Sequence, residues 1–244
     1  MTLQSQSATC MEEVCELLAD RLLCQAQRLP SGPDSSRRSI IAIAGVPGSG
    51  KSSIAAEVCR LLNAALGRPL AVVVPMDGFH YYRRELDAMP DPAAAHARRG
   101  APWTFNAAAF VACLRAIRDQ DEVLVPSFDH GAGDPVKGDI AVGPSHQLIL
   151  VEGNYLLLDE EPWAEVRELA NEAWFVDVPL DQAMARVALR QVAIGVPAHV
   201  AAQRVATNDR PNADLVALTR GNADLVVPAS LPLRGRRKRD KIGT

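Results

Sequence analysis

The residues from Gly45 to Ser52 have the types and the spacing of a phosphate-binding loop. They read G-V-P-G-S-G-K-S and fit the P-loop pattern G-x-x-x-x-G-K-[ST]. Glycines in such a loop let the backbone turn its N–H groups inward, which forms a concave site of partial positive charge. The helix expected next adds free N–H groups and the positive end of its dipole. The stretch therefore indicates a site for the phosphates of a nucleotide.

Two side chains of this loop carry chemistry of their own. Lys51 supplies a positive charge to the β- and γ-phosphates, and the hydroxyl of Ser52 suits Mg²⁺, which prefers oxygen ligands. An ordinary glycine turn between a strand and a helix is the alternative. The flanking sequence argues against that alternative, because residues 40–44 form an apolar run and helical spacing follows in Ile54, Ala55, Val58, Cys59, Leu61 and Leu62.

Two acidic residues follow apolar strands elsewhere in the chain. They are Asp77, in "VVVPMDGFH", and Glu152, in "LILVEGNYLL". An acid at the end of an apolar strand is costly unless it is paired or used. Taken alone, Asp77 could cap a helix or a turn, and Glu152 could be a structural hydrogen-bond acceptor. In one chain with a P-loop, the two acids favour a role in handling a bound ligand.

For these residues to act together, the fold must bring the ends of their strands close to one another. The sequence predicts strands at residues 40–44, 70–76, 122–128, 147–153, 173–178 and 223–228. Residues 138–143 are a candidate for a short strand that pairs with 122–128. Helices are expected after the P-loop and at 11–29, 105–119, 162–170, 181–194, 197–208 and 213–220.

This alternation of strands and helices predicts the fold class. Apolar strands without a polar alternation, separated by helices, are typical of a parallel sheet that is covered on both faces. We therefore expect an α/β fold of the P-loop NTPase type, with three α/β/α layers and a mostly parallel sheet of about five strands. In such folds ligands bind at the carboxyl ends of the strands, where the P-loop and the two acids are expected.

The whole chain has the composition of an ordinary globular protein. It has 244 residues, of which 48% are hydrophobic and 23% charged, and no apolar run approaches the length of a membrane span. The N-terminus carries several acids and no basic residue before Arg21, which argues against a secretory or transit peptide. The five cysteines form no C-x-x-C pair, so we expect neither a disulfide framework nor a zinc site. A cytoplasmic location is the expectation.

Charge is distributed unevenly along the chain. Residues 234–241, "RGRRKRDK", carry six basic residues and one acid, a net charge of +5, so the remainder is near −8 when the total is −3. An acidic body argues against a nucleic-acid-binding protein. The tail is either a targeting or nucleic-acid patch or a solvated end, and its polarity favours the second. The predicted organisation is an N-terminal helix and linker (1–38), a P-loop domain (39–230) and a disordered basic tail (231–244).

The order of the motifs resembles the phosphoribulokinase/uridine kinase superfamily of P-loop kinases. After the P-loop come "DGFH", "RRGAPWTF", "PSFDH", "VEGNYLLLD", "WFVDVP" and a helix that bears arginines. The stretches "PMDGFH", "VEGNYLLLD" and "ND-x-PNA" are most similar to bacterial and fungal nucleoside/nucleotide kinase-like proteins, some of them named for fructose transport. Bacterial pantothenate kinase is a further relative by its "DGF" and "R-x-G-x-P" stretches. The resemblance covers residues from about 12 to 228.

This resemblance implies roles for individual residues. Mg²⁺ would lie at Ser52, with Glu152 holding the ion or a water in its shell, and Asp77 would face the acceptor hydroxyl. Arg186 and Arg190 would lie on a helical lid and meet the transferred phosphate. ATP would lie over Gly45, Val46, Pro47, Gly48, Ser49, Gly50, Lys51, Ser52 and Ser53. The acceptor pocket would be shaped by His80, Arg98, Arg99, Phe128, Asp129 and His130.

Other readings of these residues stay open. Arg98 and Arg99 are adjacent, so one of them is expected to face away from the pocket. Arg186 and Arg190 are four residues apart on one helical face, which fits a lid or a solvated stripe. His80 could simply cap a turn.

Residues 207–216, "TNDRPNADLV", would lie near the lid or the nucleotide base. Phe128 stands where the family usually has a tyrosine, which argues against recognition of a uridine-type base.

Phosphoryl transfer needs the same set of roles. It depends on positioning and on stabilising charge, with a carboxylate to orient the attacking hydroxyl and cations to meet the charge on the phosphate. We therefore expect a kinase that uses ATP and Mg²⁺ to phosphorylate a hydroxyl of a small metabolite, such as a sugar or a nucleoside. A uridine-kinase-like or pantothenate-kinase-like enzyme is the first alternative, and a non-catalytic ATP-binding regulator is the second.

A GTPase-like switch is disfavoured because the chain has neither an N-K-x-D run nor a D-x-x-G motif after the strand that ends V-E-G-N. The expected partner is a small-molecule substrate, with no membrane and no nucleic acid. The oligomeric state is left open, and a homodimer is one option.

Overall fold

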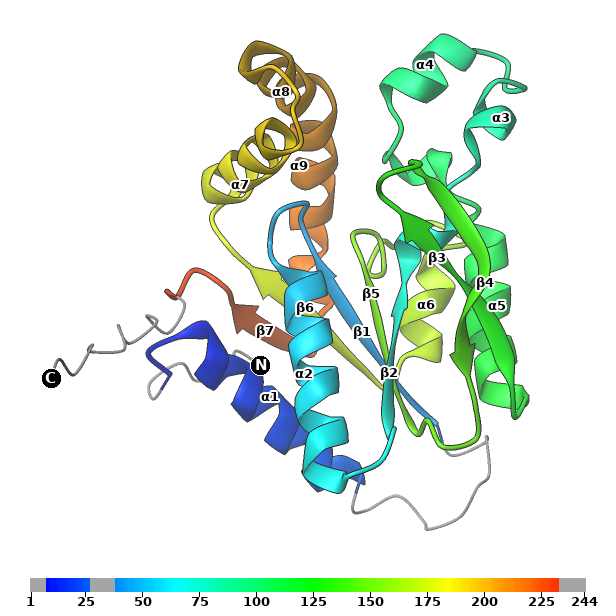
Figure 1. Cartoon of the computed structure of the whole chain (residues 1–244), viewed down its shortest axis with the longest axis vertical. Coiled ribbons are helices and arrows are strands. Elements are labelled where there is room, and N and C mark those ends of the chain that lie inside the picture. Colours follow the sequence, from blue (N-terminus) through cyan, green and yellow to red (C-terminus); the bar gives the residue numbers. More distant parts are fainter. Residues whose placement is uncertain (1–7, 27–37, 233–244) are drawn as a thin grey trace, which may run out of the picture.

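A parallel sheet forms the centre of the molecule. The computed structural model of the chain describes residues 8–26 and 38–232. The sheet has five strands in the order β2-β5-β1-β6-β7, and every neighbouring pair runs parallel (Figure 1). The predicted α/β fold with a mostly parallel sheet is confirmed. The strands are β1 (Ser39–Gly45), β2 (Ala71–Pro75), β5 (Leu148–Gly153), β6 (Glu172–Asp177) and β7 (Leu225–Pro228).

The strand order brings the three predicted strand ends together. Strand β1 pairs with β5, and β5 pairs with β2 on its other side. In these ladders Ala44 lies opposite Gly153, and Pro75 lies opposite Glu152. The P-loop follows β1, and Asp77 follows β2 by one residue beyond Met76. The phosphate loop and both acids therefore meet at one edge of the sheet.

Helices cover both faces of this sheet (Figure 1). Ile41 and Ile43 of β1 pack with buried residues of α1 and α2 on one face, whereas Ala42 and Ala44 join residues of α5 and α6 on the other. Successive side chains of a strand point to opposite faces, so a strand covered on both sides is apolar throughout. The helices of these layers are α1 (Met11–Ala26), α2 (Lys51–Leu66), α5 (Ala107–Asp119) and α6 (Ala164–Leu169).

A buried carboxylate ties α1 to the sheet. Glu172 accepts hydrogen bonds from Arg21 Nε at 2.8 Å and Gln25 Nε2 at 2.6 Å, and from the indole Nε1 of Trp174 at 2.8 Å. Val14, Leu18 and Leu22 of the helix are fully buried, so they form the side of α1 that packs on the sheet layer. Helix α1 is therefore part of the packed structure. The predicted division of the chain at residue 38 remains a prediction. Of the predicted tail, residues 233–244 lie outside the described residues, whereas Leu231 and Pro232 lie against the start of α1.

The third predicted strand belongs to a separate hairpin. Strands β3 (Val123–Asp129) and β4 (Asp134–Val142) form an antiparallel two-stranded sheet beside the main one. The proposed pairing of 138–143 with 122–128 is confirmed, and β4 begins four residues earlier than expected. Gly78 lets the hairpin approach, because a Cβ there would lie 2.1 Å from the carbonyl oxygen of Pro126. The hairpin therefore lies directly against the turn that carries Asp77.

Two groups of short helices project beyond the carboxyl ends of the strands (Figure 1). One group is the predicted helical lid, and it contains a turn of π-helix at Val205–Asp209. The other was not predicted. The lid helices are α7 (Leu180–Ala193), α8 (Ala198–Arg204) and α9 (Arg210–Leu218), and the second group is α3 (Arg83–Leu86) and α4 (Pro92–Ala97). None of the helices in the described part of the chain has both the length and the apolar character that a bilayer-spanning segment needs.

Candidate active site

The P-loop has the backbone shape that its glycines permit. Gly48 and Gly50 have φ angles of 79° and 94°, in the left-handed region, and α2 begins at Lys51. A Cβ on Gly48 would lie 2.4 Å from the carbonyl oxygen of Ala183. The hydroxyl oxygen of Ser49 is buried and has no hydrogen-bond partner among the described residues. An unpartnered buried hydroxyl in a loop at a helix N-terminus fits a site that is completed by phosphate oxygens.

Glu152 lies beside the loop and is almost completely buried. Its side chain is hydrogen-bonded to Ser52. Burial raises the pKa of Glu152, the positive charge of Lys51 opposes that rise, and the negative charge of Asp77 adds to it. These interactions show that the four side chains lie close enough to influence one another. A cation bound here would stabilise the ionised carboxylate.

The residues present fit a magnesium ion that is held partly by nucleotide. Within residues 8–26 and 38–232, no group of three or more His, Cys, Asp or Glu side chains is arranged to hold a metal ion. Mg²⁺ is usually bound by one or two carboxylates together with substrate phosphates and waters. Ser52 and Glu152 supply such a partial set next to the phosphate loop.

Asp77 lies on a short 3₁₀ turn, Met76–Phe79, that follows β2. Its side chain is 39% exposed, in contrast to Glu152. A carboxylate that is open on one side and near a phosphate loop is able to reach the hydroxyl of a bound molecule. The prediction that Asp77 faces the acceptor is untested, and its position is compatible with that role.

His80 packs in an aromatic wall next to Asp77. Its Nδ1 atom donates to the carbonyl oxygen of Asp77 at 2.9 Å, and its ring centroid lies 3.9 Å from Phe105 and 4.8 Å from Phe128. Burial lowers the pKa of His80, and the Asp77 carboxylate opposes that change. The ring is therefore neutral near pH 7. It supports the turn of Asp77, and contact between His80 and a substrate stays a prediction.

The two predicted arginines of the acceptor pocket are used by the protein itself. Arg99 donates to the carbonyl oxygens of Tyr81 and Gly133 and to the carboxylate of Asp134, with the Asp134 contact at 2.8 Å. Its guanidinium also lies 5.8 Å from the centroid of the Phe128 ring. These contacts make Arg99 a support of the pocket wall, and direct binding of a substrate remains a prediction.

Arg98 reaches the lid. Its Nη1 donates to the carbonyl oxygen of Thr207 at 2.9 Å, and its Nη2 donates to Asn212 Oδ1 at 3.1 Å. The expectation that adjacent arginines point in different directions agrees with these partners. A substrate contact for Arg98 also remains a prediction.

Residues 128–130 occupy the end of the β3–β4 hairpin. The ring of Phe128 lies between His80 and His130, with centroid distances of 4.8 and 5.2 Å. The Asp129 carboxylate instead accepts from the backbone N–H groups of Gly131 and Ala132, at 2.7 and 3.2 Å. Phe128 thus forms part of the aromatic wall, while Asp129 holds the turn of the hairpin.

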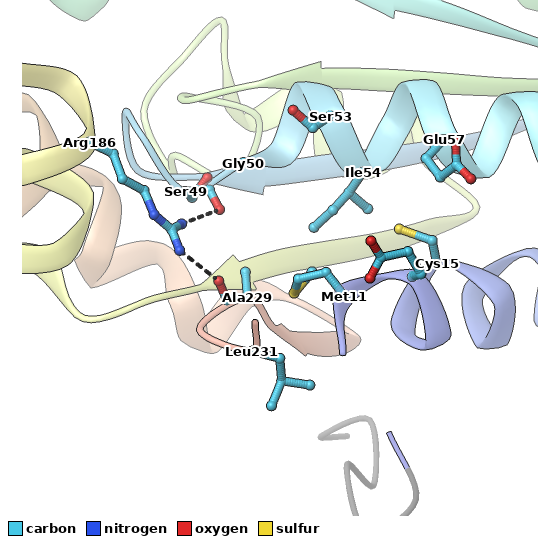
Figure 2. A pocket seen from close by; sticks show the side chains of 11 residues that line it. Met11, Cys15, Ser49, Gly50, Ser53, Ile54, Glu57, Arg186, Ala229 and Leu231 are labelled. Carbon is cyan, nitrogen blue, oxygen red and sulfur yellow. Dashed lines mark hydrogen bonds between the residues drawn. The ribbon is translucent and has the colours of Figure 1, made fainter. Parts of the chain in front are cut away.

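The two predicted lid arginines differ in their surroundings. Arg186 donates to the carbonyl oxygens of Ser49 at 3.5 Å and Ala229 at 3.3 Å (Figure 2). It also donates to that of Gly48 at 3.4 Å. It therefore faces the outer side of the P-loop. Arg190 is exposed and lies near Asp209 on the lid. Contact of either arginine with the transferred phosphate stays a prediction.

A cavity next to the P-loop was not predicted. It has a volume of about 530 Å³ and lies between the start of α2, the start of α1 and the segment after β7 (Figure 2). Four distant parts of the chain form it, since Arg186 of α7 also lines it, so no single motif marks it. Its lining residues are Met11, Glu12, Cys15, Ser49, Gly50, Ser53, Ile54, Glu57, Arg186, Ala229 and Leu231.

Sequence reasoning also missed a polar cluster between the pocket wall and the lid. Tyr155 is fully buried, and its hydroxyl donates to the carbonyl oxygen of Gly100. Asn208 and Asn212 are buried on the lid side of the same segment. The strings "VEGNYLLLD" and "ND-x-PNA" contain these residues. The tyrosine and the asparagines within these strings were the signal that the sequence offered.

Comparison with known proteins gives the family. The sequence pattern of the phosphoribulokinase/uridine kinase family matches residues 40–228. The chain belongs to the phosphoribulokinase/uridine kinase family. A "putative uridine kinase" of Schizosaccharomyces pombe is 39% identical over 195 residues, which are 78% of this chain and 83% of the yeast protein. An ATP-dependent kinase-like protein of Aspergillus versicolor is 40% identical over 162 residues, 64% of this chain and 94% of that protein.

Solved structures agree with this family membership. A "putative fructose transport system kinase" of Silicibacter sp. TM1040 has a TM-score of 0.76 and 33% identity, and the match covers 87% of this chain and 98% of that one. The YFH7 protein of Saccharomyces cerevisiae, described as having a circular permutation, has a TM-score of 0.74 at 21% identity. The resemblance to P-loop kinases of the phosphoribulokinase/uridine kinase family is confirmed. The named relatives are kinases, and they do not agree on an acceptor.

Proposed function

We propose that this member of the family transfers the γ-phosphate of Mg·ATP to a hydroxyl group of a small metabolite. The observation that carries the proposal is the meeting of three groups at neighbouring strand ends. The P-loop follows β1, the buried Glu152 ends β5, and the half-exposed Asp77 follows β2. A phosphate cradle, a metal-side carboxylate and an accessible base are the parts that phosphoryl transfer requires.

Each group has a distinct role in this proposal. The P-loop N–H groups and Lys51 hold the phosphates and balance their charge. Ser52 and Glu152 would hold Mg²⁺, which neutralises charge on the phosphate oxygens when it is bound. The Asp77 carboxylate accepts the proton of the attacking hydroxyl, whose oxygen forms the new bond to phosphorus as the bond to the leaving ADP breaks.

The cavity beside the P-loop is the proposed site of the nucleotide base. It contains Ser49, Gly50 and Ser53, so it is continuous with the phosphate loop, and its volume falls within the range of about 300–1,000 Å³ for small-molecule sites. Arg186 forms part of its wall, where a guanidinium can stack on a planar ring. This assignment places the base away from the aromatic wall of His80, Phe105 and Phe128.

The aromatic wall is then left for the acceptor. Phe128 and the neutral His80 offer apolar faces, and Asp77 offers a carboxylate at their edge. Such a mixture suits a compact polyhydroxylated molecule with an apolar face, such as a sugar. Arg99, the arginine next to this wall, already uses both Nη atoms for Tyr81, Gly133 and Asp134, and its charge is paired with the Asp134 carboxylate, so only its buried Nε has no partner among the described residues. We therefore favour an uncharged acceptor over one that carries a phosphate or carboxylate.

A coupled assay of ADP release across sugars, nucleosides and vitamins tests the proposed function. The wild-type protein should release ADP with at least one acceptor and with Mg²⁺. Lys51→Ala should abolish release while the melting temperature of the nucleotide-free protein is unchanged, because the ammonium faces phosphate. A protein that binds Mg·ATP but releases no ADP with any acceptor would instead be a non-catalytic regulator.

A further inference from the structure

The pocket wall and the lid are joined by hydrogen bonds at one place. The side-chain amide of Asn208 donates to the carbonyl oxygen of Arg99 at 2.9 Å. In the opposite direction, the guanidinium of Arg98 donates to the carbonyl oxygen of Thr207 and to Asn212 Oδ1. Asn212 in turn donates to Asn208 Oδ1 at 3.4 Å. The segment 98–100 and the π-helical turn of the lid therefore hold each other.

This junction is shielded from water on the lid side. Asn208 is 3% exposed and Asn212 is 4% exposed. A buried amide that loses its partner pays the desolvation penalty without compensation, so such groups keep their hydrogen bonds. The π-helical turn Val205–Asp209 accounts for the placement, because Asn208 lies within it. Single π-helical turns inside α-helices occur frequently at functional sites.

The junction continues towards the P-loop. Asp209, next to Asn208, accepts a hydrogen bond from Gln191 Nε2 of α7 at 3.2 Å. Gln191 is itself buried and lies on the helix that carries Arg186. Arg186 contacts the carbonyl oxygens of Gly48 and Ser49 in the P-loop. A continuous series of contacts thus runs from the P-loop through α7 and the π-helical turn to the pocket wall.

We propose that Asn208 is a positioning residue that couples nucleotide binding at the P-loop to the order of the acceptor-side segment 98–105. This proposal rests on the proposed function, in which the P-loop binds Mg·ATP. When nucleotide orders the P-loop and Arg186, α7 is held in place. The Asp209–Gln191 bond then fixes the π-helical turn, and Asn208 fixes the backbone of Arg99. Nucleotide binding therefore favours the ordered arrangement of the pocket wall that receives the acceptor.

The hydrogen bond of Asn208 is the critical contact, because its acceptor is a backbone carbonyl oxygen of the pocket wall. This bond to the Arg99 carbonyl oxygen restrains the backbone of the wall directly, whereas Arg98 is joined to the lid through a long, flexible side chain. The amides of Gly100, Ala101 and Thr104 are hydrogen-bonded within the segment, to Thr104 Oγ1, Arg98 O and Ala101 O respectively. These amides report any change in the order of the wall.

Hydrogen exchange with and without Mg·ATPγS tests the coupling, and it needs no knowledge of the acceptor. In the wild-type protein, Mg·ATPγS should slow the exchange of segment 98–105 by at least about fivefold, the lower end of ordinary couplings between sites. In Asn208→Asp, which is isosteric but presents a carboxylate oxygen to the Arg99 carbonyl, the slowing should fall below about twofold. Protection of the P-loop and α2 should be retained in the variant.

Thr207→Ala is the matched control. It changes the neighbouring side chain of the same π-helical turn, whose hydroxyl donates to the carbonyl oxygen of Gln203, and keeps the Thr207 backbone carbonyl that receives the bond from Arg98. The bond from Asn208 to the Arg99 carbonyl oxygen is not altered by this change. The control should keep the wild-type slowing of segment 98–105.

Gln191→Met removes the hydrogen bond to Asp209, at a second point of the series of contacts. It should abolish the slowing of exchange as Asn208→Asp does. This second variant keeps the test possible if Asn208→Asp does not fold.

Two results would overturn the proposal. One is wild-type protein whose P-loop is protected by Mg·ATPγS while segment 98–105 exchanges at an unchanged rate. The other is folded Asn208→Asp or Gln191→Met protein that keeps the full slowing. Wild-type protein with no protection of the P-loop by Mg·ATPγS would overturn the proposed function, and the coupling with it. The failures of the two proposals are therefore distinguishable.

Discussion

Asp77 is the residue on which the proposed chemistry depends most directly. Replacing it by Asn keeps the volume and some hydrogen bonding but removes the proton acceptor. General-base catalysis contributes typically about 10²–10⁴-fold, so Asp77→Asn should lower kcat for phosphoryl transfer by that order. The affinity for Mg·ATP should stay within a few-fold, because Ser52 and Glu152 remain. Transfer rates measured beside an ATP-binding titration check this prediction.

Two outcomes would move Asp77 to another role. Near wild-type transfer in Asp77→Asn would leave the residue as a structural cap of the turn Met76–Phe79. Loss of Mg·ATP binding would make it a metal ligand instead. Asp129→Asn is a suitable control, because that carboxylate holds a hairpin turn in the same region.

Glu152 should make the stability of the nucleotide-free protein depend on pH. Burial raises its pKa above the ordinary value of 4.5, so the folded protein holds this proton more tightly than the unfolded chain does. Stability from this group is therefore full below pH 4.5 and decreases as pH rises towards the folded-state pKa. Glu152→Gln removes the ionisation. Its melting temperature, relative to wild type, should therefore increase as the pH rises above 4.5.

The same substitution should weaken the response to nucleotide. Glu152→Gln loses the carboxylate that would hold Mg²⁺, so Mg·ATP should raise its melting temperature less than it raises that of wild type. A melting difference that is constant with pH would contradict the raised pKa.

Many residues of the candidate site could be found from the sequence, because they belong to short motifs. The P-loop spans eight consecutive residues, and the two acids directly follow apolar strands. The partners of Arg98 and Arg99 were not predictable, since they lie between 18 and 114 residues away in sequence, at Tyr81, on the hairpin and on the lid. Adjacent arginines suggest ligand binding, yet only tertiary contacts decide whether a guanidinium is already occupied.

At the scale of elements, α7 places two arginines in different environments. Arg190 is exposed, while Arg186 contacts the P-loop carbonyls and the cavity. Arg190→Ala should lower kcat far more than it raises the KM for ATP, with a loss of roughly 10³-fold if the residue meets the transferred phosphate. Arg186→Ala should mainly raise the KM for ATP. Steady-state kinetics with an acceptor from the screen distinguish the two arginines.

An increase in KM with an unchanged kcat in Arg190→Ala would place that residue in simple ATP binding. Equal effects of both substitutions would mean that the contacts of Arg186 with the P-loop do not set its role.

The elements themselves were predicted where periodicity is strong. The five strands of the sheet and the long helices follow continuous apolar or helical patterns. Helices α3 and α4 have only four and six residues, too few to show a period. The first four residues of β4, "DPVK", were missed because a proline and two charged residues do not indicate a strand. The cavity could not be predicted, since α1, α2, α7 and the segment after β7 create it jointly.

At the scale of the whole molecule, the basic tail can be separated from the kinase fold. Removing residues 234–244 should leave ADP release and the melting temperature nearly unchanged, because a segment so rich in charge cannot bury enough apolar surface to pack. The deletion keeps Leu231, which lines the cavity. A decrease of several degrees in the melting temperature would show that the tail packs on the fold. A change of cellular location alone would show that the tail is a targeting signal.

The first helix and the last strand are neighbours although the sequence separates them by about 200 residues. The backbone N–H of Met11 donates to the carbonyl oxygen of Pro232 at 3.0 Å. The packed body is therefore nearly a closed loop of chain. A short linker between these two points, with a new opening at a surface turn, would reorder the sequence and leave the sheet intact. In a chain reordered in this way, the P-loop, Asp77 and Glu152 would keep their places at the strand ends, so the site does not depend on which of these elements comes first in the sequence.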